Sequence, residues 1–267
     1  VLPADYKIKG KLYEIKPTTN PQTVTIESHQ ELDISSPNTK PDSYEYETGL
    51  ISVSEYNNSK IGIIWIGDGY TEIYGQFYEF NTSTPIPSLI EIAPTYSNKV
   101  NAGTNNFAIN TNQVEGFIYK ILPNIKLLED DKYVISFGGG NNKTNASLTG
   151  QTISKNTYGR VINSKNESIV PSNNTDNSKK INSSPDSTYN HCIHNNINII
   201  NKQIISCFAL YNESDPHLLL KSSDIYCKIL DENLNETKSA FKVNTLRKHP
   251  NYKQSNPIIT IINENKF

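Results

Sequence analysis

The chain contains the segment Asn124-Ile125-Lys126-Leu127-Leu128-Glu129-Asp130-Asp131-Lys132-Tyr133-Val134-Ile135-Ser136-Phe137, in which two short apolar runs flank a charged turn. The first run alternates apolar and polar residues, and the second is rich in β-branched and aromatic residues. Asp130 and Asp131 are typical turn residues, so the segment is predicted to form a β-hairpin. A lone hairpin cannot bury its apolar face in water, and this one therefore needs neighbours of the same kind.

Three further copies of the hairpin occur along the chain, starting at Leu50, Ile197 and Ile258. The last copy reaches only the start of its second strand, at Phe267. Equivalent positions in the four second strands are separated by about 72, 71 and 63 residues, at Ile61, Tyr133, Ile204 and Phe267. Recurrence at a nearly constant period indicates a repeat architecture.

Two more strand-like segments follow each hairpin in a fixed order. The first has a small residue at its third position, where a glycine in a strand marks a bulge or the close approach of another backbone. These segments are 8–13, 73–78, 157–162 and 225–230, and the short strands after them are 32–36, 107–111, 180–183 and 241–245. Four strands per repeat is the unit of a β-propeller blade. The sequence thus predicts an all-β, propeller-like fold with about four four-stranded antiparallel blades.

The repeats are predicted to form one domain over residues 1–267, since this length suits a single core. The repeat units are 49–111, 123–183, 195–245, and 1–48 taken together with 256–267. One blade is therefore predicted to be split between the N- and C-termini.

This order of strands resembles the degenerate propeller-type repeats of large secreted and cell-surface proteins in bacteria and protists. The similarity is clearest at Ile73–Tyr78, Phe107–Thr111, Pro123–Phe137 and Phe241–Phe267. It is weaker at Lys180 and Ile181, and among the loops after the second strands only Gly67-Asp68-Gly69 keeps the family's character. Such repeats carry no catalytic residue set. The resemblance therefore implies architecture without enzymatic chemistry and without a cofactor.

Composition narrows the function classes further. The formal net charge is -2, which gives no electrostatic case for binding nucleic acid or an anionic membrane. No apolar run approaches the length of a transmembrane helix. The chain has no methionine and starts at Val1, which suggests a mature product or an excerpt of a longer protein.

Asparagine is abundant, and several asparagines lie in Asn-x-Ser/Thr acceptors for N-glycosylation. Almost all of these acceptors fall in predicted loops, which favours a secreted, extracellular or cell-surface glycoprotein. Asn182, at the edge of a short strand, is the exception. The acceptors are Asn57, Asn81, Asn142, Asn145, Asn166, Asn173, Asn182, Asn212 and Asn235. Codon bias in an AT-rich genome is the alternative explanation for the asparagine content.

Three segments are predicted to be loops because they are polar and show no sustained period: 14–30, 81–104 and the disorder-like 163–190. The run Gly138-Gly139-Gly140 is glycine-rich, but it lacks the Gly-Lys-Ser/Thr ending and the helix of a phosphate-binding loop. No phosphate site is predicted there.

Candidates for metal or acid–base chemistry are few. His191-Cys192-Ile193-His194 lacks the second ligand pair of a zinc site, so no metal site is predicted. The histidines His29, His217 and His249 are isolated in the sequence. A glycosidase needs two carboxylates facing each other across a cleft, and no such pair can be nominated from the sequence.

The chain has three cysteines. Cys207 and Cys227 lie on predicted neighbouring antiparallel strands, where a cross-strand disulfide is possible, and Cys192 would then be free or intermolecular. The alternative is that Cys207 is a core residue and Cys227 replaces the small glycine of its strand.

The two ends of the chain suggest how it assembles. Read from tail to head, Lys266-Phe267-Val1-Leu2 continues the interrupted strand. The ends could close a four-bladed ring, complete the blade of another subunit in a head-to-tail homopolymer, or belong to a longer array. The residues of the assembly strand would be Ile258, Ile261, Phe267, Val1 and Leu2.

Two functions follow from this reading. The first is a structural subunit of an extracellular glycosylated fibre or surface coat. The second is a secreted, non-enzymatic binding module for carbohydrate or protein, with Trp65, Tyr70 and Tyr74 on its binding face. Packing within the strands is the favoured explanation for these aromatic residues.

Overall fold

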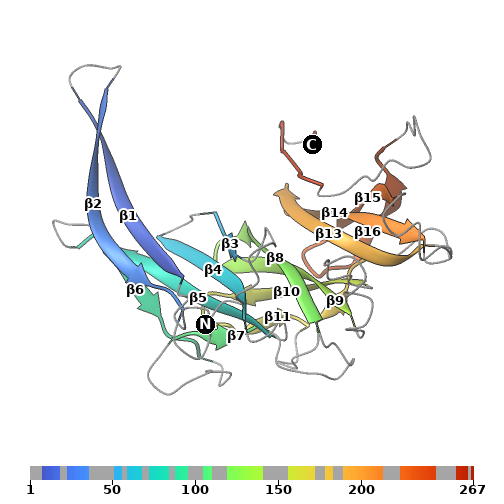
Figure 1. The fold of residues 1–267 in the computed structure, drawn as a ribbon, viewed down its shortest axis with the longest axis horizontal. Coiled ribbons are helices and arrows are strands. Elements are labelled where there is room, and N and C mark those ends of the chain that lie inside the picture. Colours follow the sequence, from blue (N-terminus) through green and yellow to red (C-terminus); the bar gives the residue numbers. More distant parts are fainter. Residues whose placement is uncertain are drawn as a thin grey trace, which may run out of the picture.

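The computed structural model of the chain consists of β-strands and their connections. It describes residues 8–18, 23–35, 51–55, 59–67, 72–83, 88–95, 105–109, 119–140, 156–171, 178–182, 189–212, 223–244, 257–263 and 266–267. The described residues contain no helix, and so none that could span a membrane. The strands form four antiparallel sheets (Figure 1).

Three of the sheets are blades in which the strand order follows the chain. The first blade contains β3 (Ile51–Val53), β4 (Lys60–Gly67), β5 (Glu72–Asn81) and β6 (Ser88–Ile92), with β7 (Phe107–Ala108) paired to β5. The second contains β8 (Tyr119–Glu129), β9 (Lys132–Gly140), β10 (Asn156–Asn163), β11 (Ser168–Val170) and β12 (Lys179–Lys180). The third contains β13 (Tyr189–Ile200), β14 (Gln203–Asn212), β15 (Ser223–Leu230) and β16 (Glu236–Lys242).

The fourth sheet is a hairpin made of β1 (Lys9–Pro17) and β2 (Val24–Asp33). It corresponds to the third and fourth strands of a blade, because one backbone hydrogen bond recurs at the same place in all four sheets. In each case an amide near the fourth strand donates to a carbonyl at the start of the third strand. The pairs are Ile34 to Ile8 (2.8 Å), Ile109 to Ile73 (2.8 Å), Ile181 to Thr157 (2.9 Å) and Val243 to Ile225 (2.9 Å).

The sheets stack face to face, and their apolar faces make a core at each junction. Between the first and second blades the Phe77 and Tyr133 rings lie 4.7 Å apart, and both side chains are fully buried. Leu128 and Ile197 share a second cluster between the second and third blades. The hairpin packs on the first blade through Ile8. The segment 257–263 packs on the third blade, at the other end of the row (Figure 1).

The predicted all-β, propeller-like fold with antiparallel blades is confirmed. The prediction that 14–30, 81–104 and 163–190 are loops is wrong where these segments form strands. Residues 14–30 lie mostly in β1 and β2, 88–92 form β6, and 168–170 and 179–180 form β11 and β12. These strands lie at the outer side of the sheets, where half-exposed polar residues replace the alternation that marks a buried strand.

The predicted blade shared between the two termini falls partly outside the described residues, which do not include Val1 and Leu2. Among the described residues β1 pairs with β2, and the bridge at the other end joins Asn263 to Lys266. No described ladder joins β1 to 257–267. The split blade and the repeat boundaries therefore stay predictions.

Candidate functional site

The first strands of the three blades lie side by side, since β8 contacts β3 and β4 on one side and β13 on the other. A polar residue occupies the same register position in each of these first strands. It pairs with a second-strand residue that in turn pairs with the small residue of the third strand. These polar residues are Ser52, Asn124 and Asn196.

Ser52 and Asn124 each bond to the backbone of the next first strand, and Asn196 bonds to the backbone of the segment 257–263. Ile125 N donates to Ser52 Oγ (3.1 Å), and Asn124 Nδ2 donates to the carbonyl of Asn195 (3.0 Å). Ile259 N donates to Asn196 Oδ1 (3.3 Å). The partners are separated by 73, 71 and 63 residues, so these hydrogen bonds recur with nearly the same period as the sequence repeats.

Two β-bulges interrupt the first strands at this level. The register of β8 shifts between Ile121 and Asn124, and that of β13 shifts between Ile193 and Asn196. Bulges bend a strand and redirect a side chain, and they are over-represented next to active sites. Here the second bulge brings Asn195 toward the second blade.

Asn195 has only 7% of its surface exposed. Its Oδ1 accepts a hydrogen bond from Ser136 Oγ (3.0 Å), and Ser136 is fully buried on β9. The Asn195 Nδ2 group has no hydrogen-bond partner among the described residues. A buried donor without a partner costs about 1–3 kcal/mol. We call Asn124, Ser136 and Asn195 the inner-strand cluster.

The inner-strand cluster consists of neutral donors and acceptors. The carboxylate of Glu55, which follows β3, is already bonded to β8. Lys126 Nζ lies 2.5 Å from Glu55 Oε1, and Leu127 N donates to Glu55 Oε2 (3.0 Å). The cluster can therefore orient a neutral ligand rich in hydroxyl groups. It does not supply an acid or a base.

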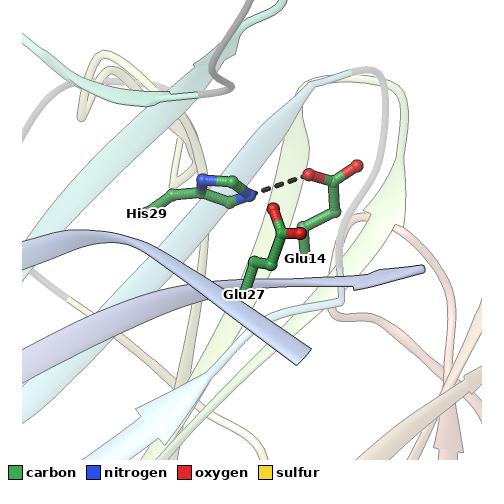
Figure 2. Close-up of side chains that lie close together, drawn as sticks. All are labelled: Glu14, Glu27 and His29. Carbon is green, nitrogen blue, oxygen red and sulfur yellow. Dashed lines mark hydrogen bonds and ion pairs between the residues drawn. The ribbon is translucent and has the colours of Figure 1, made fainter. Parts of the chain in front are cut away.

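A second group of polar side chains lies on the hairpin (Figure 2). Glu14 and Glu27 face each other across β1 and β2, and His29 Nε2 lies 2.8 Å from Glu14 Oε2. Potential ligand atoms of the three residues lie within 4.8 Å of one another, which suits a metal ion. The Lys16 ammonium already bridges the carboxylates, 2.7 Å from Glu27 Oε2 and 3.4 Å from Glu14 Oε2.

The hydrogen bond with His29 lowers the pKa of the Glu14 carboxyl, against a smaller opposing effect of burial, and Lys16 lowers it further. Lys16 thus supplies the positive charge that a metal ion would bring, and we assign no metal to this group. Sequence analysis missed the group because it treated 14–30 as a loop. Recognising the hairpin would have placed Glu14 opposite Glu27.

Two of the three aromatic residues considered for a binding face are buried. Trp65 is fully buried and Tyr74 is 4% exposed, with their ring centroids 6.3 Å apart in the junction with the hairpin. They serve strand packing, the favoured alternative. Tyr70 lies outside the described residues.

Four glycosylation acceptors have described side chains. Asn235 is exposed and Asn81 is half-buried, whereas Asn166 and Asn182 are 4% and 7% exposed. Asn182 Oδ1 accepts from the Thr157 amide (2.9 Å), so its side chain is part of the blade. Asn212 lies in β14, and the other acceptors, Asn57, Asn142, Asn145 and Asn173, lie outside the described residues.

The remaining predicted residues are the disulfide pair, the segment 191–194 and the assembly strand. Cys207 and Cys227 are directly opposite on β14 and β15 and form a disulfide, with a Cα–Cα distance of 4.1 Å. The segment 191–194 lies in β13, but its side chains are not described. Of the predicted assembly residues, Ile261 packs on the third blade, whereas Ile258 and Phe267 are 84% and 43% exposed.

No protein-family model matches the chain, and no curated protein matches it by sequence. Solved structures match its fold. A Penicillium chrysogenum α-L-arabinanase complexed with arabinobiose has a TM-score of 0.43 and 10% identity, with 87% of this chain and 58% of that chain covered. A family 43 arabinoxylan arabinofuranohydrolase from Bacillus subtilis has a TM-score of 0.45 and 10% identity, with 88% and 50% covered.

An α-L-arabinofuranosidase from Lactobacillus brevis has a TM-score of 0.43 and 10% identity, with 72% of this chain and 52% of that chain covered. The chain thus spans about half to three fifths of the length of these structures. At this level of identity the likeness concerns the fold, which in these proteins is a β-propeller.

The two functions predicted from the sequence are corrected here. A non-enzymatic fibre subunit or binding module was expected because the repeats carry no catalytic motif, but these structures with the propeller arrangement are glycoside hydrolases. The prediction that the chain is not an enzyme is contradicted by the same finding, because these propeller structures are enzymes. In a propeller, first strands far apart in sequence meet near one axis, so a site needs no local motif.

Proposed function

We propose that the chain is a carbohydrate-active protein whose inner-strand cluster contacts a glycan. The observation that carries this proposal is the Asn195 Nδ2 group, a buried donor without a described partner beside two bulged strands. A sugar hydroxyl or ring oxygen would accept this hydrogen bond. The cluster has no charged member, which favours a neutral ligand over a phosphate or an acidic peptide.

The role assigned to the cluster is to bind and orient the glycan. Asn124 and Ser136 hold Asn195 through its carbonyl and its Oδ1, so the free amide hydrogen has a defined direction. Such support by neighbouring residues keeps a binding group in position. Hydrolysis would need two carboxylates across the sugar, and we assign no residue to that step.

Arabinan and arabinoxylan are the first ligands to test, with fructan and β-glucan beside them. Release of reducing ends measures hydrolysis, and retardation in polysaccharide-containing gels measures binding. Asn195→Asp keeps the acceptor for Ser136 and removes the donor. Loss of one such hydrogen bond corresponds to weakening of roughly 5- to 150-fold. Asn233→Ala, in the exposed loop after β15, is the matched control and should bind as the unmodified chain does.

Two results would overturn the proposal. The first is the absence of both hydrolysis and retardation with every polysaccharide of the panel. The second is unchanged binding by Asn195→Asp with an unchanged urea midpoint of unfolding, which would assign the Nδ2 group to a structural water.

Secretion and N-glycosylation belong to the same proposal, as does kinship with the propeller-type repeats of secreted and surface proteins. The Cys207–Cys227 disulfide supports an oxidising compartment. After secretion from a glycosylating host, peptide mass spectrometry should find glycan at Asn81 and Asn235. Asn166 and Asn182 should be bare, since their side chains are buried. Bare asparagines at Asn81 and Asn235 would contradict this part of the proposal.

A further inference from the structure

The junction between the second and third blades differs at one level from the junction before it. Between the first and second blades, Ile64 of β4 and Ile135 of β9 belong to one apolar cluster. Strand register gives their counterparts in the next junction. Ile64 and Ser136 both pair with the small residue of a third strand, and Ile135 and Ser206 both pair with the residue after it. Two serines therefore replace two isoleucines.

Ser206 interrupts the apolar face that the third blade turns toward the second. On β14, Ile204 packs with residues of the second blade, whereas Phe208 belongs to a separate cluster. Residues two apart in a strand lie on the same face, so Ser206 faces the second blade as Ile204 does. The equivalent face of β9 is apolar without interruption, and its three residues share one cluster. They are Tyr133, Ile135 and Phe137.

The Ser206 hydroxyl is fully buried and has no hydrogen-bond partner among the described residues. Burying a hydroxyl without a partner is unfavourable. The fold does not require a polar residue at this register position, because Ile63 and Ile135 occupy it in the other two blades and are buried. A local choice that lowers stability without a structural return is typical of a functional position.

Ser206 lies near the Asn195 amide. Its partner across the ladder is Ile197, which is two residues after Asn195. Ile197 packs with the second blade and Asn195 accepts from Ser136, so both side chains point to the same junction. Diagonal neighbours across a ladder are about 7–8 Å apart, within reach of longer side chains. One oxygen atom can bridge two polar groups that are about 6 Å apart.

We propose that Ser206 is a second ligand-contacting residue of the glycan site, where one sugar hydroxyl accepts from Asn195 Nδ2 and donates to Ser206 Oγ. The Asn195 amide nitrogen only donates and the serine hydroxyl can accept, so a hydroxyl group complements the pair. A ring oxygen does not, since it cannot donate. This inference rests on the proposed function and names the group that the site recognises.

Access to the two atoms follows from the same serine pair. Both atoms are covered in the structure, so a sugar reaches them when the second and third blades part at this level. Ser136 and Ser206 contribute no apolar contact here, and separating them therefore exposes less apolar surface than separating Ile64 from Ile135 would.

Ser206→Ala removes the hydroxyl and tests the inference in two ways. Retardation by arabinan and arabinoxylan should weaken by roughly 2- to 13-fold, as expected for the loss of one hydrogen bond. The urea midpoint of unfolding should stay unchanged or rise, because no partner within the protein is lost. Ser239→Ala, at an exposed position on β16 of the same blade, is the matched control and should change neither quantity.

A double variant tests whether one hydroxyl bridges the two atoms. Asn195→Asp combined with Ser206→Ala should weaken retardation by less than the product of the two single losses, since both changes remove contacts to the same group. Losses that multiply would overturn the shared hydroxyl.

The outcomes separate this inference from the proposal on which it rests. If no polysaccharide of the panel retards the unmodified chain, both fail. If Asn195→Asp weakens retardation and Ser206→Ala does not, only this inference is overturned. A lower urea midpoint for Ser206→Ala would also overturn it alone, because the hydroxyl would then bind a structural water.

Discussion

At the scale of single residues, one small residue in each third strand explains how the side chains that follow it can pack over that strand. A Cβ built on Gly75 would lie 2.8 Å from the Phe107 ring, and one on Gly159 would lie 3.0 Å from Ile181. The small residue leaves room for an apolar side chain that the recurring fourth-strand hydrogen bond brings over the strand. Cys227 occupies this position in the third blade and uses the space for a disulfide.

Gly75→Ala should destabilise the protein. Alanine in a strand would otherwise gain about 0.5–1 kcal/mol over glycine by backbone entropy. The clash with the buried Phe107 ring outweighs this gain, because overpacking a core costs roughly 1–3 kcal/mol. The measurement is the free energy of unfolding in urea. Gly10→Ala is the control, since its closest contact is the movable Cδ1 of Ile34, and it should cost less. Equal losses for the two variants would contradict the argument.

At the scale of elements, the third blade is the one that is covalently closed. Its second and third strands are joined by Cys207–Cys227, which are 20 residues apart and directly opposite in register. Both side chains are buried, 3% exposed, in the cluster that receives the segment 257–263. The bond therefore stabilises both the blade and the surface on which that segment packs.

Reduction of this disulfide should lower the free energy of unfolding by about 3 kcal/mol, the value expected for a loop of this length. Urea unfolding with and without reductant measures the change, and Cys207→Ala combined with Cys227→Ala should reproduce it. Alkylation of the denatured, unreduced chain should label one thiol, that of Cys192. Three labelled thiols would contradict the assignment.

At the scale of the whole molecule, ion pairs join the hairpin turns of successive blades. Lys60 of the first blade lies 3.1 Å from Asp131 of the second, and Lys202 of the third blade lies 2.5 Å from Glu129 of the second. The hydrogen bond from Lys132 and that from Lys202 lower the pKa of Glu129 to about 2. The turns thus add electrostatic contacts to the apolar junctions.

Acid should weaken this contact between the blades. Because the pKa of Glu129 falls from 4.5 to about 2 on folding, its contribution to stability is present above pH 4.5 and is lost as pH falls toward 2. Glu129→Gln should therefore reduce the loss of stability over this range. Urea midpoints measured across it give the comparison, with Glu31→Gln on the exposed hairpin as control. An unchanged acid profile in Glu129→Gln would contradict the prediction.

The sequence was informative where burial imposes a strict pattern. The second strands β4, β9 and β14 are buried on both faces, so each reads as an apolar run at the same place in its repeat. The outer strands β2, β6 and β11 are partly exposed and carry Glu, Ser and Thr, which left no such pattern to read. Asn195 was overlooked for two reasons. Its burial depends on a bulge, and asparagine is so common in the chain that this one did not stand out.

By itself, the sequence determined that the chain is built from repeated hairpins, each followed by a strand with a small residue, and that Cys207 and Cys227 lie on neighbouring strands. Only the tertiary structure decided that Glu14, Glu27 and His29 meet and that the Asn195 amide is buried without a described partner. It also decided that Ser136 and Ser206 face the same junction between blades. These features depend on the register of strand pairing and on which sheet faces are covered, and both are set by contacts between residues far apart in the chain.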